Sequence, residues 1–308
     1  MEGSSAKLGS HQPSRSISLP SRLHPNSQKI EAQLNKLKTN WDFSFSLRET
    51  PIGSDTIQSG LTDLAVLYSS TKELIQSPLT QQALLQNHSR KMVEETLDGS
   101  IGLLDACGAA RDLLLGMKEN VQSLQSAIRR RVVGDSSIES NVQAYMSFRK
   151  NAKKELAKSL RALKTMQKNL PPVHYFVHED NPLQVVTKVL RELSTTAISI
   201  FSSLFVFLSV PLIKSKSNGW SLISKLVPLT FAASDRGHKI FNEVGSVDIS
   251  LCSLQGQLRK NDAKIDVEMV LTRLQTLDGC IDGLEAGLDC LFRCLIQHRV
   301  SLLNLLTP

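Results

Sequence analysis

Aromatic residues are scarce in this chain of 308 residues, at 5% of the sequence, and leucine dominates the apolar set. Leu-rich, aromatic-poor cores suit packed helices better than β-sandwiches. The five cysteines show no paired spacing, which predicts reduced thiols in a reducing compartment. No apolar run follows the first residues, so we expect no secretory signal and a cytoplasmic protein.

Catalytic signatures are also missing. We find no nucleophile elbow, phosphate-binding loop or His-Glu metal motif in the sequence. Cys280, Cys290 and Cys294 lack a fourth metal ligand, and we interpret them as buried small apolar residues. His174 and His178 have the i, i+4 spacing of a metal-binding helix, but flanking prolines favour a polar surface loop. We therefore expect no enzyme, no cofactor and no metal site.

The charge balance is strongly basic. The formal net charge is +7 and the isoelectric point is near 9.2. Apolar residues make up 41% and charged residues 21%, as in an ordinary soluble globular protein. The positive excess favours acidic partners or an anionic membrane surface, although a property of the whole chain defines no site.

The most regular pattern lies near the end of the chain, from Val267 to Leu305. Apolar residues recur there in alternating steps of three and four, which is heptad spacing. Gly279, Gly283 and Gly287 favour close approach of a neighbouring helix on another side. We interpret this helix as the intramolecular spine of a bundle, with a coiled-coil homo-oligomer as the alternative. The candidate packing seam is Leu274, Leu277, Ile281, Leu284, Leu288, Leu291 and Leu295.

The remaining periodicity predicts an all-α, mainly antiparallel multi-helix bundle with long helices. We expect three parts: a disordered Ser/Arg/Pro-rich tail at 1–28, a short helix and linker at 29–55, and the bundle domain at 56–308. Ser77 is expected to cap a helix that begins at Pro78. The other expected helices lie at 28–38, 57–76, 79–131 (one helix or two), 138–170, 193–213, 220–229 and 236–260.

The expected helix at 138–170 is the most basic element, and its eight cations between 149 and 168 face only one acid, Glu155. Such a row is either a solvated helix face or a contact surface for anionic lipid. Nucleic acid is disfavoured because stacking aromatics do not alternate with the cations. The candidate contacts with an anionic surface are Arg149, Lys150, Lys153, Lys154, Lys158, Arg161, Lys164 and Lys168.

Residues 193–213 carry no charge over 21 positions, which is long enough to span a membrane. Seven of them are Ser or Thr, however, and Pro211 interrupts the end. Phe201, Phe205 and Leu208 also form a helical stripe, as in a bundle core. We expect a buried core helix and keep a membrane span or membrane-associated hairpin as the alternative.

The N-terminal tail contains a motif with a known physical basis. An Arg three residues before Ser18 and a Pro two residues after it match the phosphoserine motif bound by 14-3-3-type adaptors. The phosphate of such a motif pairs with an Arg cluster on the adaptor. A plastid transit peptide, or a tail without a reader, fits the same composition. The candidate phosphosite and adaptor motif is Arg15, Ser16, Ser18 and Pro20.

Five runs of this sequence together span nearly the whole chain, at residues 15–25, 79–84, 97–107, 220–226 and 299–306. In this order they resemble the plant BYPASS-type family, a land-plant group long catalogued as a domain of unknown function. The tail run has Leu19 where many members have Phe, and Leu23 where many have Ser.

The resemblance implies a mostly helical plant protein with no established biochemical activity and no catalytic residues to transfer. Family members are linked to root and shoot development through control of a mobile root-derived signal. We therefore expect a non-enzymatic regulatory or scaffold protein that acts through protein–protein contacts. The alternatives are a membrane-associated protein that uses 193–213 and the basic helix at 149–168, and a helical enzyme of small-signal metabolism.

Overall fold

The computed structural model describes residues 25–46, 52–84, 90–130, 137–170, 182–209, 242–259 and 267–307. The expectation of an all-α fold is confirmed, and the described residues contain no strand. The helices are α1 (Pro25–Ser46), α2 (Ser54–Gln76), α3 (Pro78–Leu84), α4 (Arg90–Arg129), α5 (Ser137–Asn169), α6 (Pro182–Leu208), α7 (Glu243–Arg259) and α8 (Val267–Leu306).

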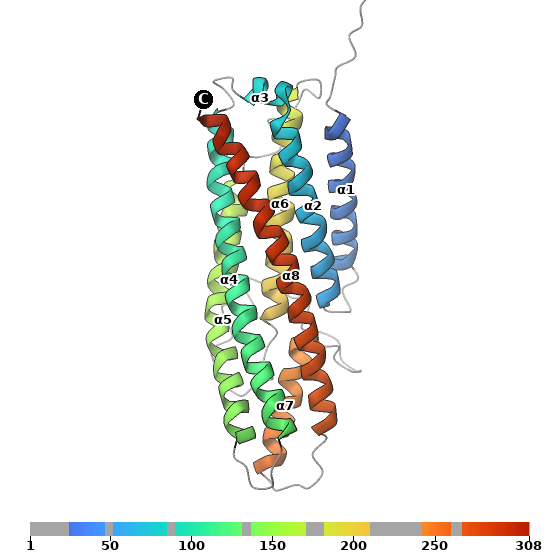
Figure 1. Cartoon of the computed structure of the whole chain (residues 1–308), viewed down its shortest axis with the longest axis vertical. Helices are drawn as coiled ribbons and strands as arrows, with labels where there is room; N and C mark the ends of the chain where they lie inside the picture. The colour runs from blue at the N-terminus through green and yellow to red at the C-terminus, as the bar shows by residue number, and fades with distance from the viewer. Residues whose placement is uncertain are drawn as a thin grey trace, which may run out of the picture.

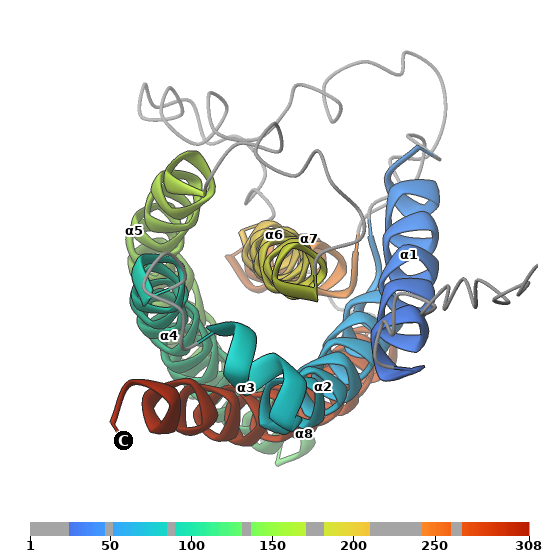
Figure 2. The ribbon, with the colours of Figure 1, turned by 90° about the horizontal axis from the view of Figure 1, so that it is seen from above.

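Five helices form a curved wall around two helices that lie along the axis of an elongated bundle (Figures 1 and 2). The wall runs in the order α1, α2, α8, α4 and α5, and each helix packs against the next. The axis is occupied by α6 in the upper half of Figure 1 and by α7 in the lower half. The short helix α3 lies at the upper end.

The helix expected to be the spine, α8, lies in this wall and not at the centre. Its seven seam residues are all buried, and α8 packs on α2, α4 and α7. The opposite side of α8 remains exposed. The central helix is α6, in which Lys188 is the only exposed residue between 184 and 208. A helix that is apolar on every side is stabilised by burial on every side.

The charge-free segment at 193–213 is therefore a core helix as far as Leu208, where α6 ends. Of the helices described, α6 alone is long and apolar enough to cross a bilayer, and 61% of its apolar window is buried in the bundle. A core helix of a soluble bundle passes the same length and composition test. Residues 210–213 lie outside the described residues.

Two of the three glycines in α8 lie against α2, as their spacing predicts. A Cβ on Gly287 would lie 3.3 Å from Leu61, and one on Gly283 would lie 2.6 Å from the Gln58 side chain. The expectation is wrong for Gly279, which has no atom within 4 Å of such a Cβ. The spacing alone does not show which of the three glycines lie against α2. Each step of four residues rotates the position by about 40° around the helix, so the first glycine points in a different direction from the last.

The stretch 79–131 forms two helices, and the second is continuous over 40 residues through Gly99 and Gly108. Helix α3 ends at Leu84 and α4 begins at Arg90, so neither glycine separates the two helices. Ser77 caps α3 as expected, since its Oγ accepts a hydrogen bond from Thr80 N at 3.4 Å.

The N-terminal helix is longer than its periodicity predicts. Helix α1 begins at Pro25 and runs to Ser46, so residues 41–46 are helical and not part of a linker. Trp41 is buried and donates a hydrogen bond from Nε1 to Ser199 Oγ of α6 at 3.1 Å. Lys38 pairs with Glu192 of α6 at 3.1 Å. These contacts fasten α1 to the central helix.

Candidate functional site

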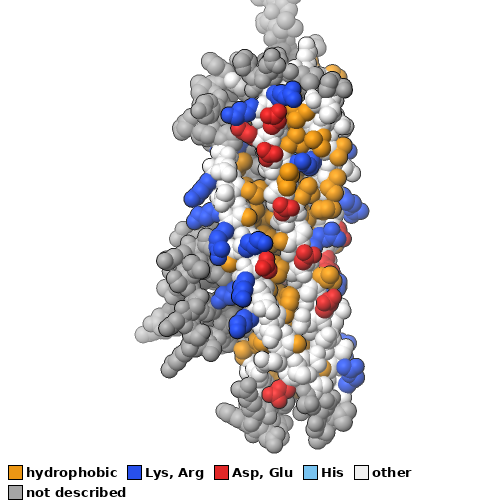
Figure 3. Space-filling view, turned by 90° about the vertical axis from the view of Figure 1, so that its left-hand side faces the viewer, with side chains coloured by type: hydrophobic (Ala, Val, Ile, Leu, Met, Phe, Trp, Pro, Cys, Tyr) orange, Lys and Arg blue, Asp and Glu red, His pale blue; other side chains and the backbone are white. Residues whose placement is uncertain are grey.

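Six cations lie in one row along the outward side of α5, and we call this row the cation stripe. They are spaced by three or four residues, so they share one side of the helix. Figure 3 shows a column of blue Lys and Arg side chains on the side of the molecule where α5 lies. Lys153 is half-buried and lies beside the row. The stripe consists of Lys150, Lys154, Lys158, Arg161, Lys164 and Lys168, all of which are exposed.

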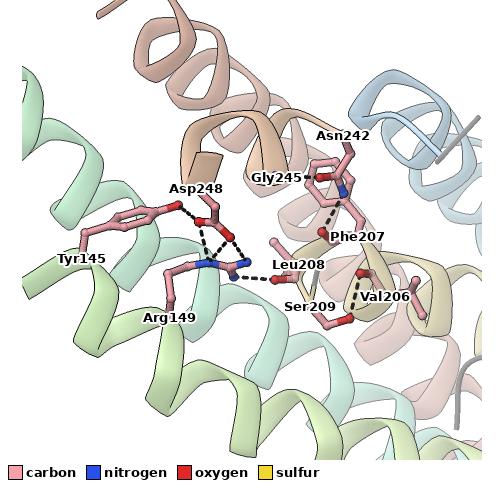
Figure 4. Close-up of polar contacts among 9 residues, drawn as sticks. All are labelled: Tyr145, Arg149, Val206, Phe207, Leu208, Ser209, Asn242, Gly245 and Asp248. Atoms are coloured by element: carbon pink, nitrogen blue, oxygen red, sulfur yellow. Dashed lines mark hydrogen bonds and ion pairs between the residues drawn. The ribbon is translucent and has the colours of Figure 1, made fainter. Parts of the chain in front are cut away.

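Arg149 does not belong to this surface, which corrects the sequence-based prediction. Its side chain is 3% exposed and is paired with Asp248 of α7, whose side chain is 1% exposed. Arg149 Nη2 lies 2.9 Å from Asp248 Oδ2, and Tyr145 Oη donates to Asp248 Oδ1 at 2.8 Å (Figure 4). A buried charge requires such partners because removal from water penalises it strongly.

The same group of residues joins the two axial helices end to end. Arg149 Nη1 donates to the Leu208 carbonyl at 2.6 Å, and Asn242 Nδ2 donates to the Phe207 carbonyl at 2.8 Å. Asn242 Oδ1 also accepts from Gly245 N at 2.9 Å and so caps α7. The last carbonyls of a helix have no partner within the helix. The cluster therefore satisfies the buried end of α6 and the buried start of α7.

Electrostatics at this junction keep the Arg149 guanidinium charged and the Tyr145 phenol neutral. Burial disfavours the charged guanidinium and by itself would lower the pKa of Arg149. The attraction and hydrogen bonding of the Asp248 carboxylate, with a contribution from Tyr145, together exceed this penalty, so the pKa of Arg149 is raised. Burial, followed by the charge of Asp248, raises the pKa of Tyr145 well above its usual value. Tyr145 is thus a hydrogen-bond donor to Asp248 and not a proton carrier.

One signal in the sequence could have identified the buried arginine. The apolar residues on the packed side of α5 recur in steps of three and four, and Tyr145 and Arg149 occupy two of those positions. A charge at a seam position predicts burial, whereas its residue type alone predicts exposure. The seam positions are Ile138, Val142, Tyr145, Arg149, Ala152 and Leu156, and all are buried.

A second surface is apolar and lies over α4 and the C-terminal part of α8; we call it the α4–α8 patch. Its members are between 41% and 47% exposed, which is high for large aliphatic side chains. Arg299 fixes the two helices here by donating to Ser100 Oγ at 2.8 Å. Figure 3 shows apolar side chains gathered on the upper part of this side of the molecule. The patch consists of Ile101, Ile296 and Val300.

A third cluster joins α2, α7 and α8. Ser54 Oγ donates to Glu243 Oε1 at 2.6 Å, and Ser54 N donates to the same oxygen at 3.2 Å. Cys280 Sγ lies 3.1 Å from Ser54 Oγ. Burial raises the pKa of the Cys280 thiol, so it stays protonated and is a poor nucleophile. This arrangement caps the start of α2 with a carboxylate, which the helix dipole favours.

The expectation of buried cysteines is wrong for Cys290, which is exposed, while Cys280 and Cys294 are half-buried. The described residues contain no group of three or more side chains suited to a metal ion. His174 and His178 lie outside the described residues, as does the phosphoserine motif from Arg15 to Pro20.

Comparison with known proteins identifies a family. The family model described as Protein BPS1 matches residues 60–305, which is most of the chain. No curated protein and no solved structure matches.

Proposed function

Because the chain belongs to the BPS1 family of plant developmental regulators, which is not a known enzyme family, we propose that it acts as a non-enzymatic scaffold. In this proposal the rigid bundle presents binding surfaces to protein partners in root and shoot development. The phosphorylated tail, through Ser18, adds a regulated contact with a 14-3-3-type adaptor.

The observation that carries the proposal is the α4–α8 patch. The buried centre of a protein interface is more apolar and carries fewer charges than the rest of the protein surface, and the patch has this character. Arg111 and Phe292 extend this surface, since the Arg111 guanidinium lies 5.5 Å from the centre of the Phe292 ring. Arg and aromatic residues are enriched among the residues that contribute most to binding at protein interfaces.

The alternative of a helical enzyme has less support from the described residues. The buried polar groups at the axial junction bond to one another and to helix ends. The Ser54, Glu243 and Cys280 cluster has a protonated thiol in place of an activated nucleophile. The nearby carboxylate is committed to the start of α2.

Affinity capture of the tagged full-length protein from plant cells tests the patch. The variant is Ile101→Ser with Ile296→Ser and Val300→Ser. The matched control is Val66→Ser with Leu115→Ser and Met269→Ser, whose side chains are 46% to 52% exposed elsewhere on the bundle. We expect the patch variant to lose partners that the control retains. Equal partner sets for the two variants would refute the role of the patch.

A separate experiment tests the tail. The full-length protein is captured with and without phosphatase treatment, and again as Ser18→Ala. We expect an adaptor of the 14-3-3 type to leave the complex in both cases, because the phosphate supplies the pairing with its Arg cluster. If the adaptor is absent from the untreated complex, or unchanged by either treatment, the tail contact is refuted while the patch is unaffected.

A further inference from the structure

We propose that the cation stripe of α5 docks on an anionic membrane surface, with the headgroups of acidic lipids as its ligands. The stripe and the α4–α8 patch lie on different elements, so either proposal can fail alone.

The geometry of the stripe suits a flat, extended ligand. At 100° and 1.5 Å per residue, the six members span about 27 Å along α5 and fall within about one third of its circumference. They occur on nearly every turn from Lys150 to Lys168. A row of this length can meet several headgroups at once, whereas a single bound anion would contact only one or two members.

The described residues leave the charge of the stripe almost uncompensated. Among them, Glu155 is the one acid paired with a member, and it lies 4.0 Å from Lys158 with both side chains more than 60% exposed. An exposed pair of this length contributes little, so the field of the stripe is open to an external anion. The net charge of +7 adds a long-range attraction of the same sign.

The bundle holds α5 so that this side faces outward. Arg149 is anchored to Asp248 on the packed side of α5. Two glycines of α4 receive side chains of α5: a Cβ on Gly116 would lie 2.6 Å from Phe148, and one on Gly102 would lie 2.5 Å from the Met166 sulfur. Contacts this close resist rotation of α5 about its axis. The stripe is therefore preorganised before any ligand binds.

The surroundings of the stripe favour lipid over nucleic acid and over a protein partner. Single-stranded nucleic acid binds where aromatic rings stack on bases, but Tyr145 is buried and Phe148 packs on Gly116. Protein interfaces centre on large apolar or aromatic anchors, and none of the exposed large apolar residues described lies on α5. A contact made by cations alone is typical of binding to acidic headgroups without insertion.

The contribution of each cation sets the expected effect. One Lys or Arg near an acidic bilayer strengthens binding about fivefold, so removing three of the six weakens it about 100-fold. Because the attraction is electrostatic, salt should reverse the binding as the screening length shortens.

The experiment measures vesicle binding of the purified full-length protein by flotation. Vesicles of phosphatidylcholine are compared with and without phosphatidylserine. The stripe variant is Lys154→Gln with Lys158→Gln and Lys164→Gln. The matched control is Lys29→Gln with Lys36→Gln and Lys91→Gln, which are exposed cations of α1 and α4. Both variants lower the net charge from +7 by the same three charges, to +4.

We expect binding only to vesicles that contain phosphatidylserine, a loss of about 100-fold in the stripe variant, and a much smaller loss in the control. Equal losses would overturn the proposal, because the effect would then follow from net charge alone. Binding that persists in high salt would also overturn it, since that indicates insertion of an apolar segment. An oligonucleotide is tested in parallel. If the stripe variant loses only oligonucleotide binding, the stripe is a nucleic-acid surface instead.

Discussion

Substitution of Asp248 by asparagine should be among the most destabilising changes of a single charge in this protein. The change leaves the volume of the side chain nearly intact but strands the Arg149 guanidinium, which is buried and paired with Asp248 at 2.9 Å. Removing one partner of a buried ion pair costs about 3–5 kcal/mol, because the remaining charge is neither hydrated nor compensated. Arg149→Met should cost at least as much, since the Leu208 carbonyl also loses its donor.

The double variant provides the sharper test. Arg149→Met with Asp248→Asn removes both charges, and the main remaining loss is the unpaired Leu208 carbonyl, at about 1–3 kcal/mol. The double variant should therefore be more stable than the sum of the single effects predicts, by at least about 2 kcal/mol. The exposed pair Arg111 and Asp289, 3.0 Å apart, is the matched control and should show a coupling of about 1 kcal/mol or less.

Urea unfolding followed by far-UV circular dichroism measures these free energies. Single effects below about 1 kcal/mol, or a double variant equal to the sum of its parts, would refute the reasoning that the pair is buried and uncompensated by water. A change in the dependence of the unfolding free energy on urea would indicate a change in compactness and not in the pair itself.

Three further predictions follow from other parts of the bundle. Gly279→Ala should stabilise the protein by up to about 1 kcal/mol in urea unfolding, while Gly116→Ala should destabilise it by about 1–3 kcal/mol, because only the latter Cβ meets a ring, that of Phe148 at 2.6 Å. Reversed signs would contradict the packing of α4 on α5. Burial lowers the pKa of His298 to about 4, below its unfolded value of about 6.5. Its neutral form therefore contributes stability above pH 6.5 that is lost as the pH falls toward 4, by about 3 kcal/mol. His298→Leu should remove that part of the pH dependence of unfolding, and an unchanged pH profile would show that His298 is not buried. A thiol reagent should label Cys290 in the native protein but not Cys107, which is buried and whose pKa burial raises to about 12. Rapid native labelling of Cys107 would place it at the surface.

The helices of the wall could be predicted because their signal is local. The seam residues of α8 recur in the sequence in steps of three and four residues, and all of them are buried in the structure. The charge-free core of α6 was equally visible in composition, but its place at the axis was not. Apolar periodicity in a sequence predicts which side of a helix packs. Whether a helix lies at the centre follows only from its exposed surface in the folded structure.

The axial junction could not be predicted, because its partners are distant in the chain. Arg149 and Asp248 are separated by 99 residues, and no rule of spacing pairs them. Arg149 was assigned to the surface by its residue type, although its position in the α5 seam indicated burial. The remaining basic residues of α5 were identified from sequence, and the structure adds that six of them form one outward row.

The meeting of α6 and α7 has a topological consequence. Ser209 follows the last residue of α6, Asn242 precedes the first residue of α7, and the Asn242 side chain reaches the Phe207 carbonyl at 2.8 Å. The two ends of the connection between these helices are therefore held close together by the bundle itself. Each doubling of the length of a flexible connection costs only about 0.6 kcal/mol in closure entropy. A flexible peptide added between 209 and 242 is therefore expected to lower the free energy of unfolding by less than about 1 kcal/mol through chain entropy.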